Sequence, residues 1–435
     1  MAEPAVPAEP AVTPAPAVPS LPLAPAPGRM NVDFEERVDV ARLRRYRLDR
    51  AMAAMQAAGL GALLVFDNNN IRYLTGVAIG EWTRDKLCRY ALYTRTGELV
   101  LWDFGSAAVH HRMYCPWLKP ENCIASYTTM RGAAPPASGL TGKQVAEIKD
   151  RLQAAGVGNE PVGIDWAETP TFFELQKQNI DLRDGQQVML DAREIKSRDE
   201  IALLATAAAM VDGTYADIAA ALRPGIRENE IVALAAKRLY DMGSDDVESI
   251  NAVSGERCNP HPHNFSDRMI RPGEQAFFDI MHSYNGYRTC YYRCFAVGKA
   301  TQPQIDAYTR AREWIDTAID MIKPGVSTAQ VARAWPTAAD IGLADERTAF
   351  GLLFGHGLGL ALHERPIISR LTSLPEDGGA PLEIKEGMVF ALETYCPATD
   401  GRSAARIEEE VVVGPAGVEI LTRFPAQHLY VTNPY

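Results

Sequence analysis

Three side chains with the chemistry of metal ligands stand inside apolar segments of this sequence. His356 lies in a glycine-rich run, Glu393 in Phe-Ala-Leu-Glu-Thr, and Glu408 in Arg-Ile-Glu-Glu-Glu-Val. A glutamate is rarely buried unless it is paired or coordinated, so these surroundings need an explanation. A mixed set of nitrogen and oxygen donors suits zinc, manganese, iron or cobalt. The pattern therefore indicates a transition-metal site.

Two further segments extend the pattern. Asp279 lies in Phe-Phe-Asp-Ile, and Cys290 stands eleven residues later in Gly-Tyr-Arg-Thr-Cys-Tyr-Tyr-Arg. Together with His363-Glu364-Arg365-Pro366, these segments resemble the pita-bread family, which includes methionine aminopeptidase, aminopeptidase P, prolidase, creatinase and the dimethylsulfoniopropionate lyases. The order in that family is two aspartates, a histidine and two glutamates. Cys290 stands where the second aspartate belongs, so the resemblance implies the family's frame with an altered centre.

The resemblance implies that a metal would be held by Asp279, Cys290, His356, Glu393 and Glu408. Because a thiol replaces the bridging carboxylate of a two-metal site, we expect one divalent ion (zinc, manganese or iron) or none, as in creatinase. Three interpretations of Cys290 stay open. It is a soft ligand for one zinc ion, an inert small residue, or a nucleophile whose pKa is lowered by a neighbouring metal or histidine.

Two histidines and Glu393 form the catalytic set that the resemblance implies. His263, in His-Pro-His-Asn-Phe, matches a substrate-contacting histidine of the family, which is the general base in creatinase. His363 matches the histidine that stabilises the tetrahedral intermediate, and Glu393 would take the proton from water. Imidazole suits both tasks because its pKa lies near neutrality. The alternative for each is a structural histidine, and His261 is expected to face solvent in its loop.

Four residues are candidates for substrate binding: Arg406, Tyr287, Tyr292 and Trp82. Arg406 resembles the prolidase arginine two residues before a glutamate ligand, and it would grip a carboxylate. An ion pair with Glu409 or Glu410 is the alternative. The tyrosines near Cys290 would line a pocket for a small cation or pack in the core. Trp82 falls where related enzymes let a partner subunit's loop close the pocket.

Length and composition limit the remaining possibilities. At 435 residues, 47% hydrophobic and 23% charged, the chain is expected to form two soluble domains. The net charge of −11 argues against a nucleic-acid partner. Seven cysteines without a spacing pattern predict free thiols in the cytoplasm. No apolar stretch approaches the roughly 20 residues of a membrane span, and the amino terminus lacks a signal-peptide pattern, so we expect no membrane association.

The chain is predicted to have three parts. Residues 1–35, rich in alanine and proline, are expected to be disordered. Residues 36–192 resemble the α/β amino-terminal domain of creatinase. Within them we predict a helix over 42–58, a strand over 62–66 closed by an Asp-Asn-Asn-Asn turn, and a hairpin over 90–102. Residues 193–435 resemble the α+β pita-bread catalytic domain.

The second domain carries signs of an internal repeat. Ser197 and Glu200 predict a capping box for a helix ending near Ala221, and further helices are predicted over 228–242 and 304–322. The first and third of these helices end in similar segments, Leu-Arg-Pro-Gly and Ile-Lys-Pro-Gly. Pita-bread domains consist of two related αββ halves, so this likeness supports the resemblance.

We expect an enzyme that hydrolyses a C–N bond in a small polar substrate: an amide, an amidine or an Xaa-Pro dipeptide. The resemblance also implies a homodimer, because relatives with this amino-terminal domain complete their pockets across a two-fold axis. Two alternatives are a lyase of the dimethylsulfoniopropionate type and a non-catalytic binding protein. Retention of His263, His356 and His363 favours an enzyme, and a thiol at position 290 would abstract a proton only as a thiolate.

Overall fold

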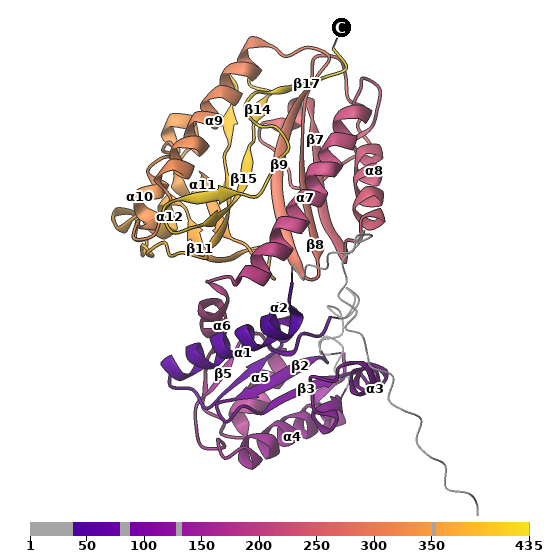
Figure 1. The fold of residues 1–435 in the computed structure, drawn as a ribbon, viewed down its shortest axis with the longest axis vertical. Coiled ribbons are helices and arrows are strands. Elements are labelled where there is room, and N and C mark those ends of the chain that lie inside the picture. Colours follow the sequence, from indigo (N-terminus) through magenta and orange to yellow (C-terminus); the bar gives the residue numbers. More distant parts are fainter. Residues whose placement is uncertain (1–37, 79–87, 128–132, 350–353, 435) are drawn as a thin grey trace, which may run out of the picture. The chain divides into compact units, whose positions relative to one another are not determined.

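The computed structural model describes residues 38–78, 88–127, 133–349 and 354–434. The predicted disordered segment 1–35 and Trp82 lie outside these ranges. Figure 1 shows one sheet formed by the first part of the described chain and further sheets formed by the remainder. The amino-terminal and carboxyl-terminal sheets share no strand.

The first sheet has six strands in the order β4-β3-β2-β1-β5-β6. The strands are β1 (Ala62–Val65), β2 (Tyr90–Thr94), β3 (Leu99–Asp103), β4 (Cys123–Ala125), β5 (Val162–Ile164) and β6 (Leu182–Asp184). The helices around it are α1 (Val40–Ala57), α2 (Asn68–Thr75), α3 (Gly105–Tyr114), α4 (Leu140–Ala154), α5 (Thr169–Lys177) and α6 (Gly185–Arg193). The predicted first helix, first strand and hairpin are confirmed.

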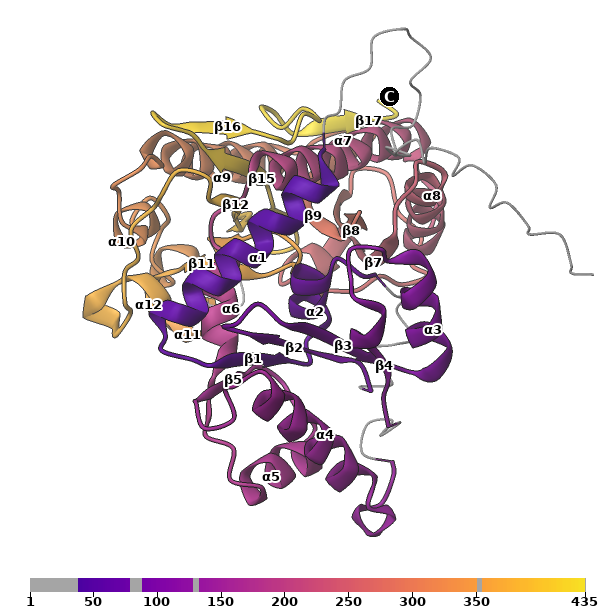
Figure 2. The same cartoon turned by 60° about the horizontal axis from the view of Figure 1, so that its bottom comes forward.

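Both faces of this sheet are buried, which explains the continuous apolar runs in its strands. Leu63 and Val65 share a core with residues of α1, whereas Ala62 and Leu64 share one with residues of α4 and α5. Figure 2 shows α1 on one side of the sheet and α4 and α5 on the other. The predicted turn after β1 was wrong. The Asp67 side chain accepts hydrogen bonds from two backbone N–H groups and caps α2 instead.

The second part begins with α7 (Arg198–Ala221), and Ser197 and Glu200 form the predicted capping box. Its other helices are α8 (Glu228–Asp241), α9 (Gln302–Met321), α10 (Thr328–Ala332), α11 (Glu346–Ala349) and α12 (Arg370–Ser373). Its strands are β7 (Asp246–Ser254), β8 (Gln275–Tyr284), β9 (Tyr287–Val297), β10 (Gly355–Gly357), β11 (Glu364–Ile368), β12 (Val389–Glu393), β13 (Cys396–Pro397), β14 (Ala404–Ala405), β15 (Glu408–Val413), β16 (Val418–Ile420) and β17 (Tyr430–Thr432).

Helix α7 is long and apolar enough to cross a membrane by length and composition alone, contrary to the expectation from the sequence. Half of its most apolar window is buried inside the protein, and its buried residues include Leu204, Val211 and Tyr215. Tyr215 donates hydrogen bonds to the carbonyl oxygens of Phe278 and Tyr291 on the neighbouring strands. The helix therefore packs as a core helix, rich in alanine because it lies close to a sheet.

Two sheets of the second part contact each other through β9 and β15. One has the order β17-β9-β8-β7 and the other the order β11-β10-β12-β15-β16. The buried Arg293 on β9 joins them, since its guanidinium donates to the Glu408 carbonyl oxygen on β15 and pairs with the Glu409 carboxylate at 2.9 Å. Figure 1 shows α7 lying along the first of these sheets and α9 beside the second.

The predicted repeat appears as two equivalent helix ends. Leu222 after α7 and Ile322 after α9 cap their helices with similar ψ angles, 114° and 116°. Arg227 and Ser327 then form isolated bridges to Met269 and Glu383 respectively. Each half thus passes from a long helix through a similar turn to a further helix, α8 or α10, and the seam between the halves runs between β9 and β15.

Candidate metal centre

The structure brings the five predicted ligand side chains together at this seam. Asp279 lies on β8, Cys290 on β9, His356 on β10, Glu393 on β12 and Glu408 on β15, and all five are buried. The Cys290 Sγ lies 3.6 Å from Asp279 Oδ1 and 3.9 Å from Glu408 Oε2. Strand pairing places Glu393 directly opposite Glu408. The first half supplies two of these side chains and the second half three.

One ring nitrogen of His356 faces the carboxyl group of Glu408. Its Nδ1 lies 2.9 Å from the Gly357 carbonyl oxygen, an acceptor, so Nδ1 carries the proton. Burial lowers the pKa of His356 to about 4, so the ring is neutral at pH 7. The unprotonated Nε2 then lies 4.0 Å from Glu408 Oε1, and neither atom has a hydrogen-bond partner within the described part of the chain. Two buried acceptors that face each other fit a shared cation.

The donor set also fits a cation of intermediate softness. Ligand atoms of Cys290, His356 and Glu408 all lie within 4.8 Å of one another. One thiol, one imidazole and one carboxylate match the ligand types that zinc accepts. The cluster therefore favours the interpretation of Cys290 as a metal ligand.

Too many acids share this cluster for all to be ionised without a cation. Burial, followed by the carboxyl groups of Glu393 and Asp279, raises the pKa of Glu408 well above its usual range. Burial raises the pKa of Asp279 to about 7 and that of the adjacent Glu410 to about 8. Burial and the neighbouring Asp279 and Glu408 also raise the pKa of the Cys290 thiol. A divalent cation would favour the ionised forms of all these groups.

Arg406 is the nearest permanent positive charge, and its partner is not one that the sequence suggested. Its Nη2 donates to Glu393 Oε2 at 3.0 Å, and its guanidinium carbon lies 3.9 Å from the centre of the Tyr292 ring. The expected alternative, a pair with Glu409 or Glu410, is wrong, because Glu409 pairs with Arg293 and Arg312. Arg406 lies two residues before β15, and its guanidinium faces Glu393 of the cluster.

Three histidines surround Arg406 and the cluster. His261 accepts a hydrogen bond from Arg406 and its ring lies 4.7 Å from that of His263, so the expectation of a solvent-facing His261 was wrong. The ring of His363 lies 4.3 Å from that of His356. Burial and the charge of Arg406 lower the pKa of His263, and burial and His356 lower that of His363 to about 4. The exposed His263 and His363 are thus neutral at pH 7 and accessible to a small molecule.

The structure does not bring Tyr287 to this cluster, although it does bring Tyr292. The Tyr287 hydroxyl donates to Glu200 at 2.8 Å and accepts from Arg47 of α1. Tyr287 and Cys290 differ by an odd number of positions on β9, so their side chains point to opposite faces of the sheet. Tyr292 shares the face of Cys290 and lies opposite Asp279.

Two supporting residues escaped the sequence reasoning. Asn251 on β7 donates to Asp279 Oδ2 at 2.9 Å, and Trp335 donates its indole N–H to the Glu393 carbonyl oxygen at 3.0 Å. Only the strand register, which pairs Asn251 with Asp279, could have indicated the first of these. Nothing in the sequence indicates the second.

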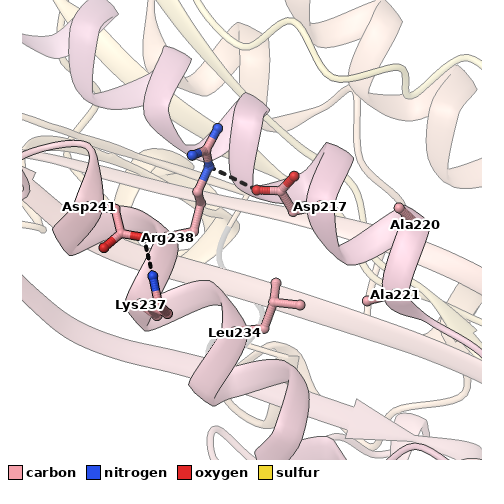
Figure 3. A pocket seen from close by; sticks show the side chains of 7 residues that line it. All are labelled: Asp217, Ala220, Ala221, Leu234, Lys237, Arg238 and Asp241. Carbon is pink, nitrogen blue, oxygen red and sulfur yellow. Dashed lines mark hydrogen bonds and ion pairs between the residues drawn. The ribbon is translucent and has the colours of Figure 1, made fainter.

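A groove of about 600 Å³ between α7 and α8 lies apart from these residues (Figure 3). Its charged side chains pair with one another: Arg238 with Asp217 at 2.8 Å, and Lys237 with Asp241. None of the residues that line it belongs to the metal cluster. Its charges are already paired, so it offers less to a ligand than the buried cluster does.

Comparisons with known proteins cover both parts of the chain. The model of metallopeptidase family M24 matches residues 202–415, and that of the creatinase/prolidase N-terminal domain matches residues 47–195. The chain is 30% identical over 395 residues to the uncharacterised peptidase YqhT of Bacillus subtilis, covering 88% of this chain and 99% of that protein. It is 25% identical to the dimethylsulfoniopropionate lyase DddP of Roseovarius nubinhibens, covering 89% and 87%.

The fold comparison gives the same result. The crystal structure of dipeptidase PepE from Mycobacterium ulcerans superposes with a TM-score of 0.72 at 25% identity, over 91% of this chain and 99% of that one. The predicted fold class, an α/β amino-terminal domain followed by an α+β pita-bread domain, is confirmed. The chain belongs to metallopeptidase family M24, in the branch that carries a creatinase/prolidase-type amino-terminal domain.

Proposed function

We propose that the protein hydrolyses a C–N bond in a small polar substrate, such as an Xaa-Pro dipeptide or another small amide or amidine. The observation that carries this proposal is a pair of buried acceptors 4.0 Å apart, His356 Nε2 and Glu408 Oε1, which have no hydrogen-bond partner among the described residues. The exposed His363 ring lies 4.3 Å from that of His356. Several similar proteins are named as dipeptidases or peptidases, and this supports a hydrolase.

Cys290, His356 and Glu408 would hold one divalent ion, with the Asp279 carboxyl group beside the thiol. When bound, such an ion supplies an activated water molecule and polarises the scissile carbonyl group. The thiol in place of a bridging carboxylate removes a ligand that two ions would share. We therefore propose a single ion per subunit.

The side chains around the ion divide the remaining tasks. Glu393 accepts a proton from the attacking water, and burial raises its pKa, which makes it a stronger base, while the charge of Arg406 limits that rise. His263 and His363 are neutral, and each neutral imidazole keeps one N–H to donate to the oxyanion. Arg406, which lies over the Tyr292 ring, would bind a charged end of the substrate.

The test combines elemental analysis with a substrate panel. Purified protein should contain about one zinc, manganese or iron ion per chain, and it should release product from dipeptides or small amides. Dialysis against a chelator should abolish turnover, and the re-added ion should restore it. Full activity in protein shown to be free of metal would contradict the metal part of the proposal, and no turnover of any C–N substrate would contradict the whole.

A lyase is the second candidate, favoured by the similarity to DddP over most of the chain. Here the side chain that stands in place of the second aspartate is a thiol, and burial, followed by the charges of Asp279 and Glu408, raises its pKa and keeps it protonated when no ion is bound; a bound ion would use the thiolate as a ligand. A protonated thiol is a poor base for abstracting a proton. Incubation with dimethylsulfoniopropionate, with volatile sulfide as the readout, separates the two candidates, since the hydrolase releases none.

A further inference from the structure

Two motifs of the sequence are only partly explained by the proposed function. The segment Arg193-Glu194-Ile195-Lys196 links the amino-terminal sheet to α7, and Glu364 follows the catalytic candidate His363. The structure joins them. Lys196 Nζ lies 3.0 Å from Glu364 Oε2, and Arg193 Nε lies 3.6 Å from Glu364 Oε1. All three side chains are at least 95% buried.

The Glu364 carboxylate also fixes the loop that presents His363. Its Oε1 accepts a hydrogen bond from the backbone N–H of Ala361 at 3.0 Å, so residues 361–364 close on themselves. Gly359 leaves the space for this arrangement, because a Cβ at that position would lie 2.7 Å from Glu364 Oε2. Strand β11 then pairs with β10, where Gly357 is opposite Glu364. The loop is thereby tied to the strand that carries His356.

The cationic end of this network is anchored to the amino-terminal domain. The hydroxyl groups of Tyr46 and Tyr73 donate to the carbonyl oxygens of Ile195 and Ala192, at 2.9 and 3.0 Å. The backbone N–H of Lys196 donates to the Gly387 carbonyl oxygen at 2.8 Å. The position of the ammonium group is therefore set by both domains, and it acts on the residue next to His363.

The contact of Arg193 and Lys196 with Glu364 is electrostatic as well as steric. Burial alone would raise the pKa of Glu364, yet Lys196 and Arg193 hold it below its usual range, so the carboxylate is ionised. A buried ionised group tolerates little movement away from its partners. We propose that Arg193 and Lys196 are positioning residues, which hold the His363 imidazole beside the metal centre through Glu364.

This inference rests on the proposed function for its kinetic test, but not for its spectroscopic one. Lys196→Met should lower kcat about tenfold or more, with KM changed less than about twofold, because small displacements of a catalytic group cost this much. Lys196→Arg keeps the charge and should restore most of the rate. In a His363→Ala background the same Lys196→Met change should have almost no further effect.

The matched control is Lys385→Met, which removes another lysine that pairs with a residue of the linking segment 193–196. Lys385 Nζ lies 3.3 Å from Glu194 Oε2, and its side chain is 52% exposed. This change should alter neither kcat nor the His363 signal. If Lys196→Met alone does not fold, Lys196→Gln takes its place, because it removes the charge and keeps an N–H donor while Arg193 still faces the Glu364 carboxylate.

The second readout does not depend on turnover. In protein labelled at its eight histidines, the His363 ring resonance is assigned by its loss in His363→Ala. It should shift or broaden in Lys196→Met and stay unchanged in Lys385→Met. A folded Lys196→Met protein with an unmoved His363 resonance would overturn the proposal, as would equal losses of kcat with and without His363. A moved resonance in a protein without hydrolase activity would sustain the positioning role and reject the proposed function.

Discussion

Restoring the family's carboxylate at position 290 is the most direct test of the altered centre. In Cys290→Asp the new carboxyl group would replace a sulfur that lies 3.6 Å from Asp279 Oδ1 and 3.9 Å from Glu408 Oε2. Two ionised carboxylates about 4 Å apart repel by about 4 kcal/mol at an effective dielectric constant of 20. Without metal, the variant should therefore lose up to about 4 kcal/mol of unfolding free energy, and less where one carboxyl group takes up a proton.

Added metal should offset this loss of unfolding free energy in the variant. Cys290→Asp should bind two ions per chain where the natural sequence binds one, and the added metal should stabilise the variant more than the natural protein. Elemental analysis gives the stoichiometry, and urea unfolding with and without metal gives the free energies. Cys290→Ser removes the thiol without adding charge and should bind less metal, whereas Cys396→Ser, at a buried cysteine outside the cluster, should change neither quantity. Two ions in the natural protein, or no increase in a folded Cys290→Asp variant, would refute this reasoning.

Three further predictions concern individual groups and the substrate. His263→Ala should leave thermal stability nearly unchanged and lower kcat by about 10²–10⁴-fold, whereas the exposed His428→Ala should be silent; loss of solubility with full specific activity would indicate a structural role instead. Arg406→Met should destabilise the protein by about 3–5 kcal/mol, because it leaves the Glu393 carboxyl group buried without its partner, and adding Glu393→Gln should recover part of this loss in urea unfolding. In a panel of small charged amides, amidines, betaine-like compounds and peptides, the best substrate should be a small molecule, and a tripeptide cleaved at about 10⁴ M⁻¹s⁻¹ or faster would show that the thiol does not limit the site.

Several elements of the fold could be predicted from short patterns in the sequence. The capping box at Ser197 and Glu200 and the hairpin over 90–102 appear as predicted because each depends on a few neighbouring residues. The Asp-Asn-Asn-Asn segment did not become a turn, since the preferences of Asp for turns and for helix N-caps have the same physical origin, a carboxylate that accepts backbone N–H groups. The helix is favoured over the turn by buried positions after Asp67 at helical spacing, such as Ile71 and Leu74.

The site residues likewise include some that the sequence could predict and others that it could not. The five ligand candidates could be found because their types and order are distinctive. The partners of Arg406 could not, because Glu393 is thirteen residues away and reaches it only through the pairing of strands. Strand alternation alone would have separated Tyr287 from Tyr292. The neighbourhood of His261 depends on how the loop before β8 folds back over Arg406, and no local pattern encodes that path.

The arginine behind the cluster suggests why its ligand set can vary. Arg293 holds β9 to β15 through the Glu408 carbonyl oxygen and the Glu409 carboxylate, on the face of the sheet away from Cys290. The two halves are thus held together by the guanidinium of Arg293, which is always charged, and not by a metal ion, which can exchange. Under this division of roles, a substitution such as cysteine for aspartate changes which ion is bound, or how many, without opening the seam. The ligands of the centre can therefore be substituted, and its chemistry changed, while the surrounding fold stays the same.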